Sequence, residues 1–131
     1  MAANDNPDKL RQVTVTSQTR YVAEQSDENN ERFVFAYTIT IRNTGELTAK
    51  LRSRHWIITD GREKVNEVRG LGVVGEQPVL KPGESFEYTS GTILATPVGV
   101  MRGSYQMVTE DGVAFDAQIP AFTLCVPRVL H

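Results

Sequence analysis

The chain has 131 residues, of which 40% are hydrophobic and 23% charged, and this length and composition are typical of one globular domain. Its formal net charge is -2, so it lacks the basic excess with which a domain binds nucleic acid or an anionic membrane. The single cysteine, Cys125, excludes an internal disulfide and argues against a small secreted scaffold held by disulfides.

The first ten residues are polar and acidic, unlike a signal segment with a charged start and an apolar centre. We therefore predict a flexible N-terminal tail over residues 1–10 and a single domain over residues 11–131. No apolar run approaches the roughly 20 residues that a membrane helix needs. The expected location is the cytoplasm, with no membrane association.

An alternation of period two dominates the remaining sequence. Over residues 32–43 the odd positions are large and apolar, and shorter runs with the same period lie at 13–16, 86–89, 101–107 and 113–119. Because alternate side chains of a strand face opposite sides of a sheet, these runs predict strands with one apolar face. Beyond Pro120 the apolar residues move from odd to even positions, which predicts a bulge or break near that proline.

Turn residues separate these runs. They lie at residues 43–45, 60–61, 81–83 and 110–112, and an acidic stretch at 24–31 predicts an exposed loop. About seven or more short strands with regular turns favour an all-β fold, a sandwich of two antiparallel sheets. An eight-stranded ligand barrel is the alternative.

A glycine-rich segment, Gly70-Leu71-Gly72-Val73-Val74-Gly75, fits the pattern G-x-G-x-x-G. In dinucleotide-binding folds such glycines let the backbone approach a pyrophosphate at the start of a helix. Here Pro78 and a further strand follow instead of a helix. We favour an irregular loop or bulged strand, and the alternative is a pyrophosphate or nucleotide site in which Gly70, Gly72 and Gly75 bind the ligand through backbone amides.

A second candidate is the segment that contains Arg52, Arg54 and Trp56. On a regular strand these three side chains share one face, where the two guanidinium groups could bind an anion or a protein partner. The favoured interpretation makes Trp56 a core residue between the sheets and the arginines the solvated end of its face. His55, on the other face, is interpreted as a hydrogen-bonded sheet histidine.

Metal and catalytic sites have weaker signals. The nitrogen and sulfur candidates are His55, His131 and Cys125, and their spacing matches no closed zinc site. The carboxylates are scattered as on an ordinary surface, and Cys125 is expected to be an inert buried thiol. No nucleophile motif is present. The predictions are therefore no cofactor, no metal site and no enzymatic activity.

Several blocks of the sequence resemble the ApaG family. They span about residues 13–127 and include Phe33–Asn43, Ser53–Gly61, Gly72–Pro78 and Ile119–Phe122. The resemblance implies an immunoglobulin-like or fibronectin type III-like sandwich. It also implies a link to cobalt tolerance and magnesium efflux in bacteria, without a known enzymatic activity. Similar domains in eukaryotic F-box proteins and a polymerase-delta-interacting protein look like modules that bind partners. The family often has an acidic residue where this chain has Leu71.

The leading hypothesis is therefore a non-enzymatic β-sandwich that binds another protein, one that influences divalent-cation handling. Loops and edge strands of such a scaffold commonly recruit partners. The alternatives are a small-ligand site and a divalent-cation site, both built on the glycine-rich loop. Free edge strands could also pair two copies of the chain into a homodimer.

Overall fold

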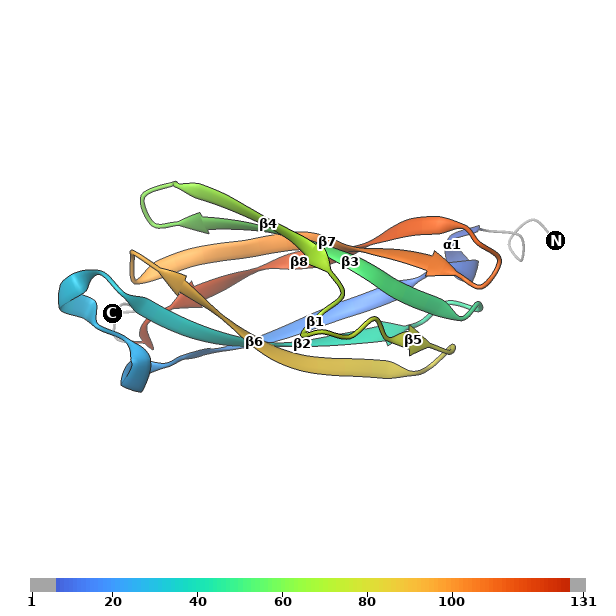
Figure 1. Ribbon diagram of the computed structural model, residues 1–131, viewed down its shortest axis with the longest axis horizontal. Coiled ribbons are helices and arrows are strands. Elements are labelled where there is room, and N and C mark those ends of the chain that lie inside the picture. The colour runs from blue at the N-terminus through green and yellow to red at the C-terminus, as the bar shows by residue number, and fades with distance from the viewer. Residues whose placement is uncertain (1–6, 128–131) are drawn as a thin grey trace.

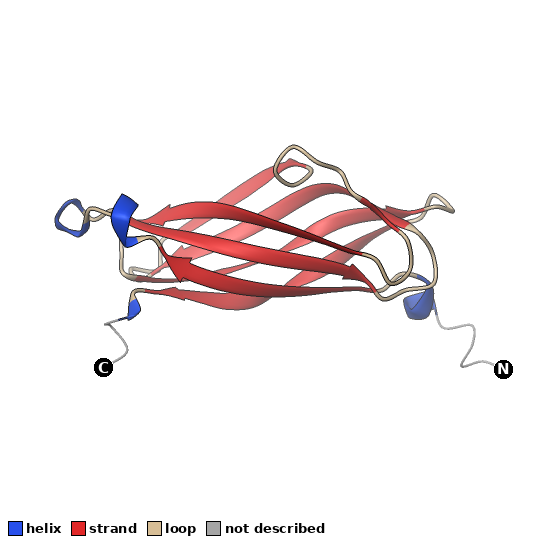
Figure 2. Ribbon diagram, turned by 90° about the horizontal axis from the view of Figure 1, so that it is seen from below, coloured by secondary structure: helices blue, strands red, loops and turns tan. Residues whose placement is uncertain are grey.

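The computed structural model describes residues 7–127, which form two antiparallel sheets packed face to face (Figure 1). The elements are α1 (Pro7–Leu10), β1 (Val13–Tyr21), η2 (Ala23–Gln25), η3 (Glu28–Asn30), β2 (Phe33–Asn43), β3 (Ala49–Asp60), β4 (Val65–Leu71), β5 (Val79–Leu80), β6 (Ser85–Leu94), β7 (Val98–Thr109) and β8 (Ala114–Cys125). The strands run along the long axis of the molecule, and most loops lie at its ends, whereas the loop between β4 and β5 lies partway along it (Figure 2). Within these residues no helix is long and apolar enough to cross a membrane.

The order of the strands determines which edges are free. The smaller sheet has the order β1-β2-β6, and the larger has the order β4-β3-β7-β8, with β5 paired to β3 beside β4. β1 contacts β8 and closes one side of the sandwich. β4 and β6 are the free edges at the other side, where residues of both strands line one groove. This is the strand arrangement of a fibronectin type III-like domain, so the predicted fold class is confirmed.

The period-two pattern of the sequence becomes the core. The odd residues of β2 face the other sheet, and Phe35, Ile39 and Ile41 are almost completely buried. Leu51, Met101 and Tyr105 of the larger sheet are buried opposite them in the same cluster. Removing these apolar side chains from water is the main stabilising term of such a sandwich.

Trp56 lies at the centre of an aromatic cluster that joins the two sheets. Its side chain is 3% exposed. The ring centroids of Trp56 and Tyr37 of the smaller sheet are 5.4 Å apart at 64°. Tyr105 and Phe122 lie 6.3 and 5.8 Å away at nearly perpendicular angles. These edge-to-face arrangements are favourable for aromatic pairs, and they confirm the prediction that Trp56 is a core residue.

Two bulges interrupt the regular pairing of β7 with its neighbours. In β8 two residues, Pro120 and Ala121, lie opposite the single residue Arg102. The extra residue lets Ile119 and Leu124 both be buried although their positions differ in parity, which confirms the bulge predicted near Pro120. In β3 the register shifts between Leu51 and Ser53.

Asn43 is a buried polar residue that makes several hydrogen bonds where the chain passes from one sheet to the other. The residue is 1% exposed. Its amide Nδ2 donates to the carbonyls of Leu47 at 2.9 Å and Leu80 at 2.8 Å. Its Oδ1 accepts from the Gly45 amide at 2.9 Å, and the Gly83 amide donates to its carbonyl. One side chain therefore joins the turn after β2 to the end of β5.

Elements without a buried face were not predicted from the sequence. β4 is exposed at nearly every position and β5 has only two residues, so neither shows the alternation that predicted the others. Pro7–Leu10, which the sequence assigned to the N-terminal tail, forms α1. The rest of that tail, residues 1–6, and the candidate ligand His131 lie outside the described residues.

A buried pair of tyrosines links the sheets by a hydrogen bond. The hydroxyl of Tyr88 in β6 lies 2.5 Å from that of Tyr105 in β7. Burial raises the pKa of Tyr88 to about 12, and it also raises the pKa of Tyr105. Both phenols therefore keep their protons in the folded protein at a pH where free tyrosine, with a pKa near 10, ionises.

We expect the folded protein to lose stability as the pH rises above about 10. From there to about 12 the unfolded chain releases protons that the folded chain retains, so each tyrosine lowers the free energy of unfolding by about 1.4 kcal/mol per pH unit. Urea unfolding at a series of alkaline pH values measures this slope. The double variant Y88F/Y105F should have a flatter profile, and an equally steep profile would contradict the assignment.

Candidate functional site

The glycine-rich segment forms the end of β4 and a tight turn. Gly72 lies opposite Arg52 and donates its amide to the Arg52 carbonyl at 2.8 Å. The amides of Val73 and Glu76 each donate to the carbonyl of the other residue at 2.8 Å. These three amides therefore take part in backbone hydrogen bonds. The favoured sequence interpretation, an irregular loop, agrees with this geometry, and ligand binding at Gly70, Gly72 and Gly75 stays a prediction.

Three glycines in this segment occupy positions that disfavour a side chain, each for a different structural reason. A Cβ on Gly70 would lie 2.8 Å from the Arg54 guanidinium, which packs over its backbone. Gly72 has φ of +63°, and a Cβ there would lie 2.3 Å from the Glu76 carbonyl oxygen. Gly75 has φ of +82° in a turn that also holds Val74 at φ of +43°. A β-branched residue rarely adopts positive φ, so this turn holds local strain.

Arg52 and Arg54 occupy different environments. Arg54 donates from Nη1 to the carbonyls of Leu71 at 3.1 Å and Gly72 at 2.9 Å, and its charge acts on the two buried tyrosines. Arg52 is exposed at the register shift in β3. Because an extra residue follows Leu51, the expectation of one regular face for both arginines is wrong. Arg54 holds the glycine-rich turn, and anion or partner contact by Arg52 stays a prediction.

The outer face of the larger sheet has two adjoining hollows, and His55 and Ser104 line both. The first has a volume of about 530 Å³ and the second about 320 Å³. The lining side chains come from β3, β4, β7 and β8 and include Arg69, Gln106, Asp116 and Gln118. Gly103 cannot carry a side chain, since a Cβ would lie 2.0 Å from the His55 carbonyl oxygen. We call these two depressions the outer-face hollows.

Polar contacts order the side chains of these hollows. His55 Nε2 lies 2.7 Å from Glu67 Oε1, as expected for a hydrogen-bonded sheet histidine. Ser53 donates to Gln106 Oε1 at 2.9 Å, and Gln106 Nε2 donates to Ser104 at 2.9 Å. One sequence signal indicates this face: in the middle of β7 the even positions Arg102, Ser104 and Gln106 are polar, between apolar residues at positions 101, 105 and 107. No such signal reveals that β4 brings Glu67 beside His55.

These hollows are open, and their linings combine polar and apolar groups with charges of both signs. Arg69 and Asp116 line the first hollow and Arg102 lines the second, and Arg69 Nη2 lies 3.7 Å from Glu67 Oε1. Within residues 7–127 no three His, Cys, Asp or Glu side chains come together to hold a metal ion. Cys125 is half-buried, and its thiol donates to the Val126 carbonyl at 3.4 Å. The arrangement offers several hydrogen-bonding groups on a broad surface, which suits contact with another polypeptide.

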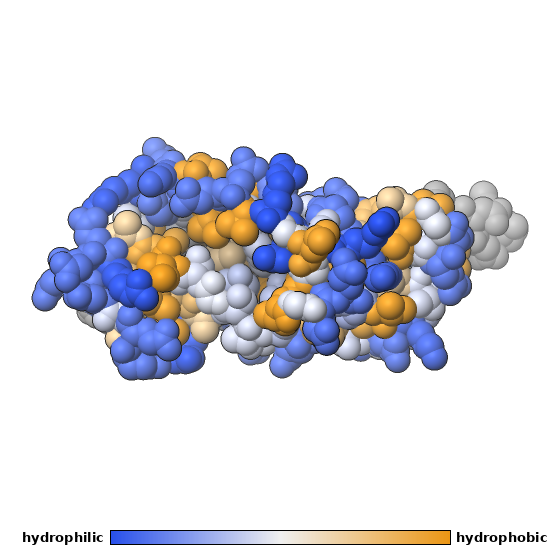
Figure 3. Space-filling model, in the orientation of Figure 1, coloured by the Kyte–Doolittle hydropathy of each residue, from blue (hydrophilic) through white to orange (hydrophobic). Residues whose placement is uncertain are grey.

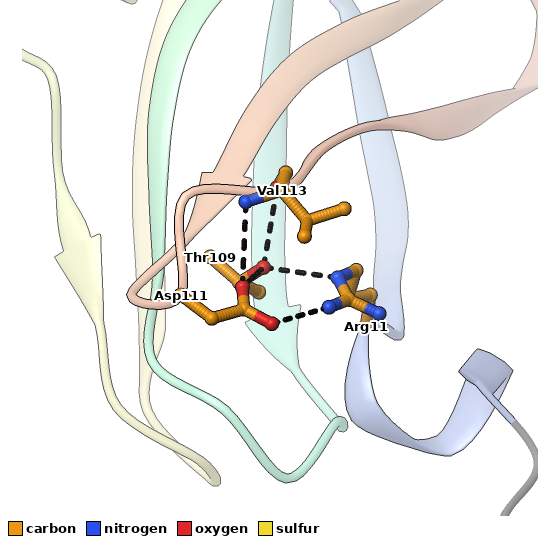
Figure 4. A network of polar contacts seen from close by, with 4 residues as sticks. All are labelled: Arg11, Thr109, Asp111 and Val113. Carbon is orange, nitrogen blue, oxygen red and sulfur yellow. Dashed lines mark hydrogen bonds and ion pairs between the residues drawn. The ribbon is translucent and has the colours of Figure 1, made fainter.

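A second polar cluster fastens the start of β1 to the turn between β7 and β8 (Figure 4). Arg11 donates from Nε to Thr109 Oγ1 at 3.0 Å and from Nη2 to Asp111 Oδ2 at 2.5 Å. The Thr109 hydroxyl lies 2.6 Å from Asp111 Oδ1. The Thr109 hydrogen bond, with help from Arg11, lowers the pKa of the Asp111 carboxyl. All its groups are mutually paired, so the cluster has a structural role.

Comparison with known proteins gives consistent matches. The ApaG domain family matches residues 23–109. Protein ApaG of Thiobacillus denitrificans is 64% identical over 123 residues, which cover 94% of this chain and 97% of that protein. Protein ApaG of Pseudomonas aeruginosa is 61% identical over 124 residues, or 95% of this chain and 98% of that protein. The crystal structure of an ApaA protein from Bordetella pertussis has 57% identity and a TM-score of 0.89, covering 92% of this chain and 98% of that one.

Proposed function

We propose that this chain, which belongs to the ApaG family, is a non-enzymatic module that binds another protein through the outer-face hollows. The names of the ApaG relatives state no enzymatic activity. The family link to cobalt tolerance and magnesium efflux suggests a cytoplasmic partner that acts in divalent-cation handling. We infer that the chain serves as a scaffold for this partner and needs no cofactor.

The observation that carries this proposal is the shape of the outer face. In a sandwich the inner faces are buried against each other and the outer faces remain available. Here that available face is hollowed, and its hydrogen-bonding groups are held in place by the pairs His55–Glu67 and Ser53–Gln106. Preordered side chains reduce the entropy lost on binding. Shallow pockets between such groups accept side chains of a partner and provide specificity.

Site-specific cross-linking tests the proposal. A photo-reactive residue at Arg102, an exposed position that lines the second hollow, should give one defined adduct with a different protein in cells. Ser104→Trp fills both hollows and should abolish that adduct. Thr38→Trp places the same bulk on the outer face of the smaller sheet, where Thr38 pairs with Thr89, and should leave the adduct unchanged.

Two results would count against the proposal. One is no adduct with a different protein at any position around the hollows. The other is an adduct that S104W and T38W reduce equally, because the partner would then not recognise the hollows. A product made of two copies of this chain does not support a heterologous partner.

A further inference from the structure

The free edge strand of the larger sheet, β4, exposes three large apolar side chains. β4 forms the left part of the upper rim of the molecule in Figure 1, and apolar patches interrupt the hydrophilic surface there in Figure 3. Val65 is 54% exposed, Val68 42% and Leu71 79%. β4 contains neither proline nor lysine, two residues with which proteins commonly protect an edge strand from pairing.

The pairing of β4 with β3 shows which backbone groups point away from the sheet. Asp60 donates its amide to Lys64 at 3.0 Å, and Gly72 donates to Arg52 at 2.8 Å. In an antiparallel pair hydrogen-bonded positions alternate, so the even residues of β4 bond to β3. The amides and carbonyls of Val65, Glu67, Arg69 and Leu71 therefore point away from β3 and form an unpaired ladder edge, in which the Leu71 carbonyl accepts a side-chain hydrogen bond from Arg54 at 3.1 Å.

The sequence of β4 is complementary to itself when two copies run antiparallel. With Val68 opposite Val68 of a second copy, Glu67 lies opposite the second copy's Arg69, and Val65 lies opposite its Leu71. Each of these pairs joins two residues whose backbone groups face outward, so the ladder bonds and the side-chain pairs share one register. Opposite charges directly across an antiparallel pair are favourable.

Neighbouring registers lack this match. Shifting one copy by two residues in one direction would put Glu67 opposite Glu67 of the second copy. Shifting it by two residues in the opposite direction would put Arg69 opposite Arg69. Like charges directly opposite each other are unfavourable. The other free edge, β6, has Glu87 as its one charged residue, so no register there pairs opposite charges. The charge pattern therefore favours pairing of two copies through β4, and it favours the register with Val68 opposite Val68.

We propose that β4 pairs with β4 of a second copy of this chain around a twofold axis at Val68. The larger sheets of the two copies then form one continuous sheet, an isologous contact in which each copy supplies the same residues. Arg69 and Leu71 line the first outer-face hollow, so the second copy's Val65 and Glu67 would lie at the rim of that hollow. This inference does not depend on the heterologous partner proposed above.

Sedimentation velocity from micromolar to millimolar concentration tests the dimer. The unaltered chain should pass from monomer to dimer as concentration rises. Glu67→Arg and Arg69→Glu should each weaken dimerisation by about tenfold, because each places two like-charged pairs across the axis. Glu87→Arg on β6, the matched charge reversal at the other edge, should leave dimerisation unchanged.

Mixing the two single variants separates contacts between copies from contacts within one copy. Glu67 also lies 3.7 Å from Arg69 of its own chain and 2.7 Å from His55, and each single variant loses such contacts. In the mixture E67R presents two arginines on β4 and R69E presents two glutamates, so a heterodimer should form although neither variant dimerises well alone. A monomeric unaltered chain at millimolar concentration, no heterodimer on mixing, or equal weakening by E87R would each overturn the proposal.

Discussion

Replacing Trp56 with alanine is expected to lower the free energy of unfolding by about 4 kcal/mol. The indole is 3% exposed and contacts aromatic rings from both sheets. Its removal loses the burial of the ring and leaves a cavity between the sheets that rigid strands cannot fill. Urea unfolding followed by circular dichroism measures the change, with the slope against urea as a check that unfolding remains cooperative.

Two comparisons define how this result is interpreted. Trp56→Phe keeps most of the apolar volume, so it should cost less than half as much as the alanine variant. Val79→Ala removes an apolar side chain that is 57% exposed and should change stability by less than about 0.5 kcal/mol. A loss below about 1.5 kcal/mol for W56A, far under the usual cost of removing a buried tryptophan, would show that Trp56 does not join the sheets as described.

Replacing Asn43 with alanine should cost about 3 kcal/mol, because the change removes two donated hydrogen bonds and one accepted hydrogen bond, each worth about 1 kcal/mol. It also leaves the Leu80 carbonyl without this donor in the interior, which adds a desolvation cost. Thermal unfolding should show a lower Tm, and amide exchange should become faster first at Gly45.

Asn66 offers the matched control for this prediction. It is the same residue type on the exposed strand β4, and N66A should leave the Tm nearly unchanged. Asn43→Asp keeps the acceptor for Gly45 but presents an oxygen to the Leu47 and Leu80 carbonyls, so it should also destabilise. Equal stability of N43D and the unaltered chain would contradict the assigned donors.

The sequence predicted the parts of the fold in which one face is buried. β2 alternates because its odd residues enter the core, and the parity change after Ile119 predicted the bulge at Pro120. The family resemblance, quoted from blocks such as Phe33–Asn43, is confirmed by the match to the ApaG domain family. Local periodicity and turn residues were sufficient here because they reflect burial directly.

The edge strands, and the contacts between side chains of neighbouring strands, could not be predicted from local sequence patterns. β4 contacts another strand on one side alone and buries little, so its composition shows no period. The extra residue near Arg52 broke the assumption of regular alternation, and the sequence offers no signal for it comparable to Pro120. The outer-face hollows depend on which strands are neighbours, and this register follows from long-range pairing that local sequence does not specify.

The two bulges beside β7 have a consequence for how the chain finds its native pairing. Each neighbour of β7 has one surplus residue at a fixed place, near Arg52 in β3 and at Pro120 in β8. Sliding β7 by one step against either neighbour would turn its apolar side chains outward and misplace the kink at the same time. Misaligned alternatives are thus penalised twice, and we expect refolding to reach a single alignment of these three strands.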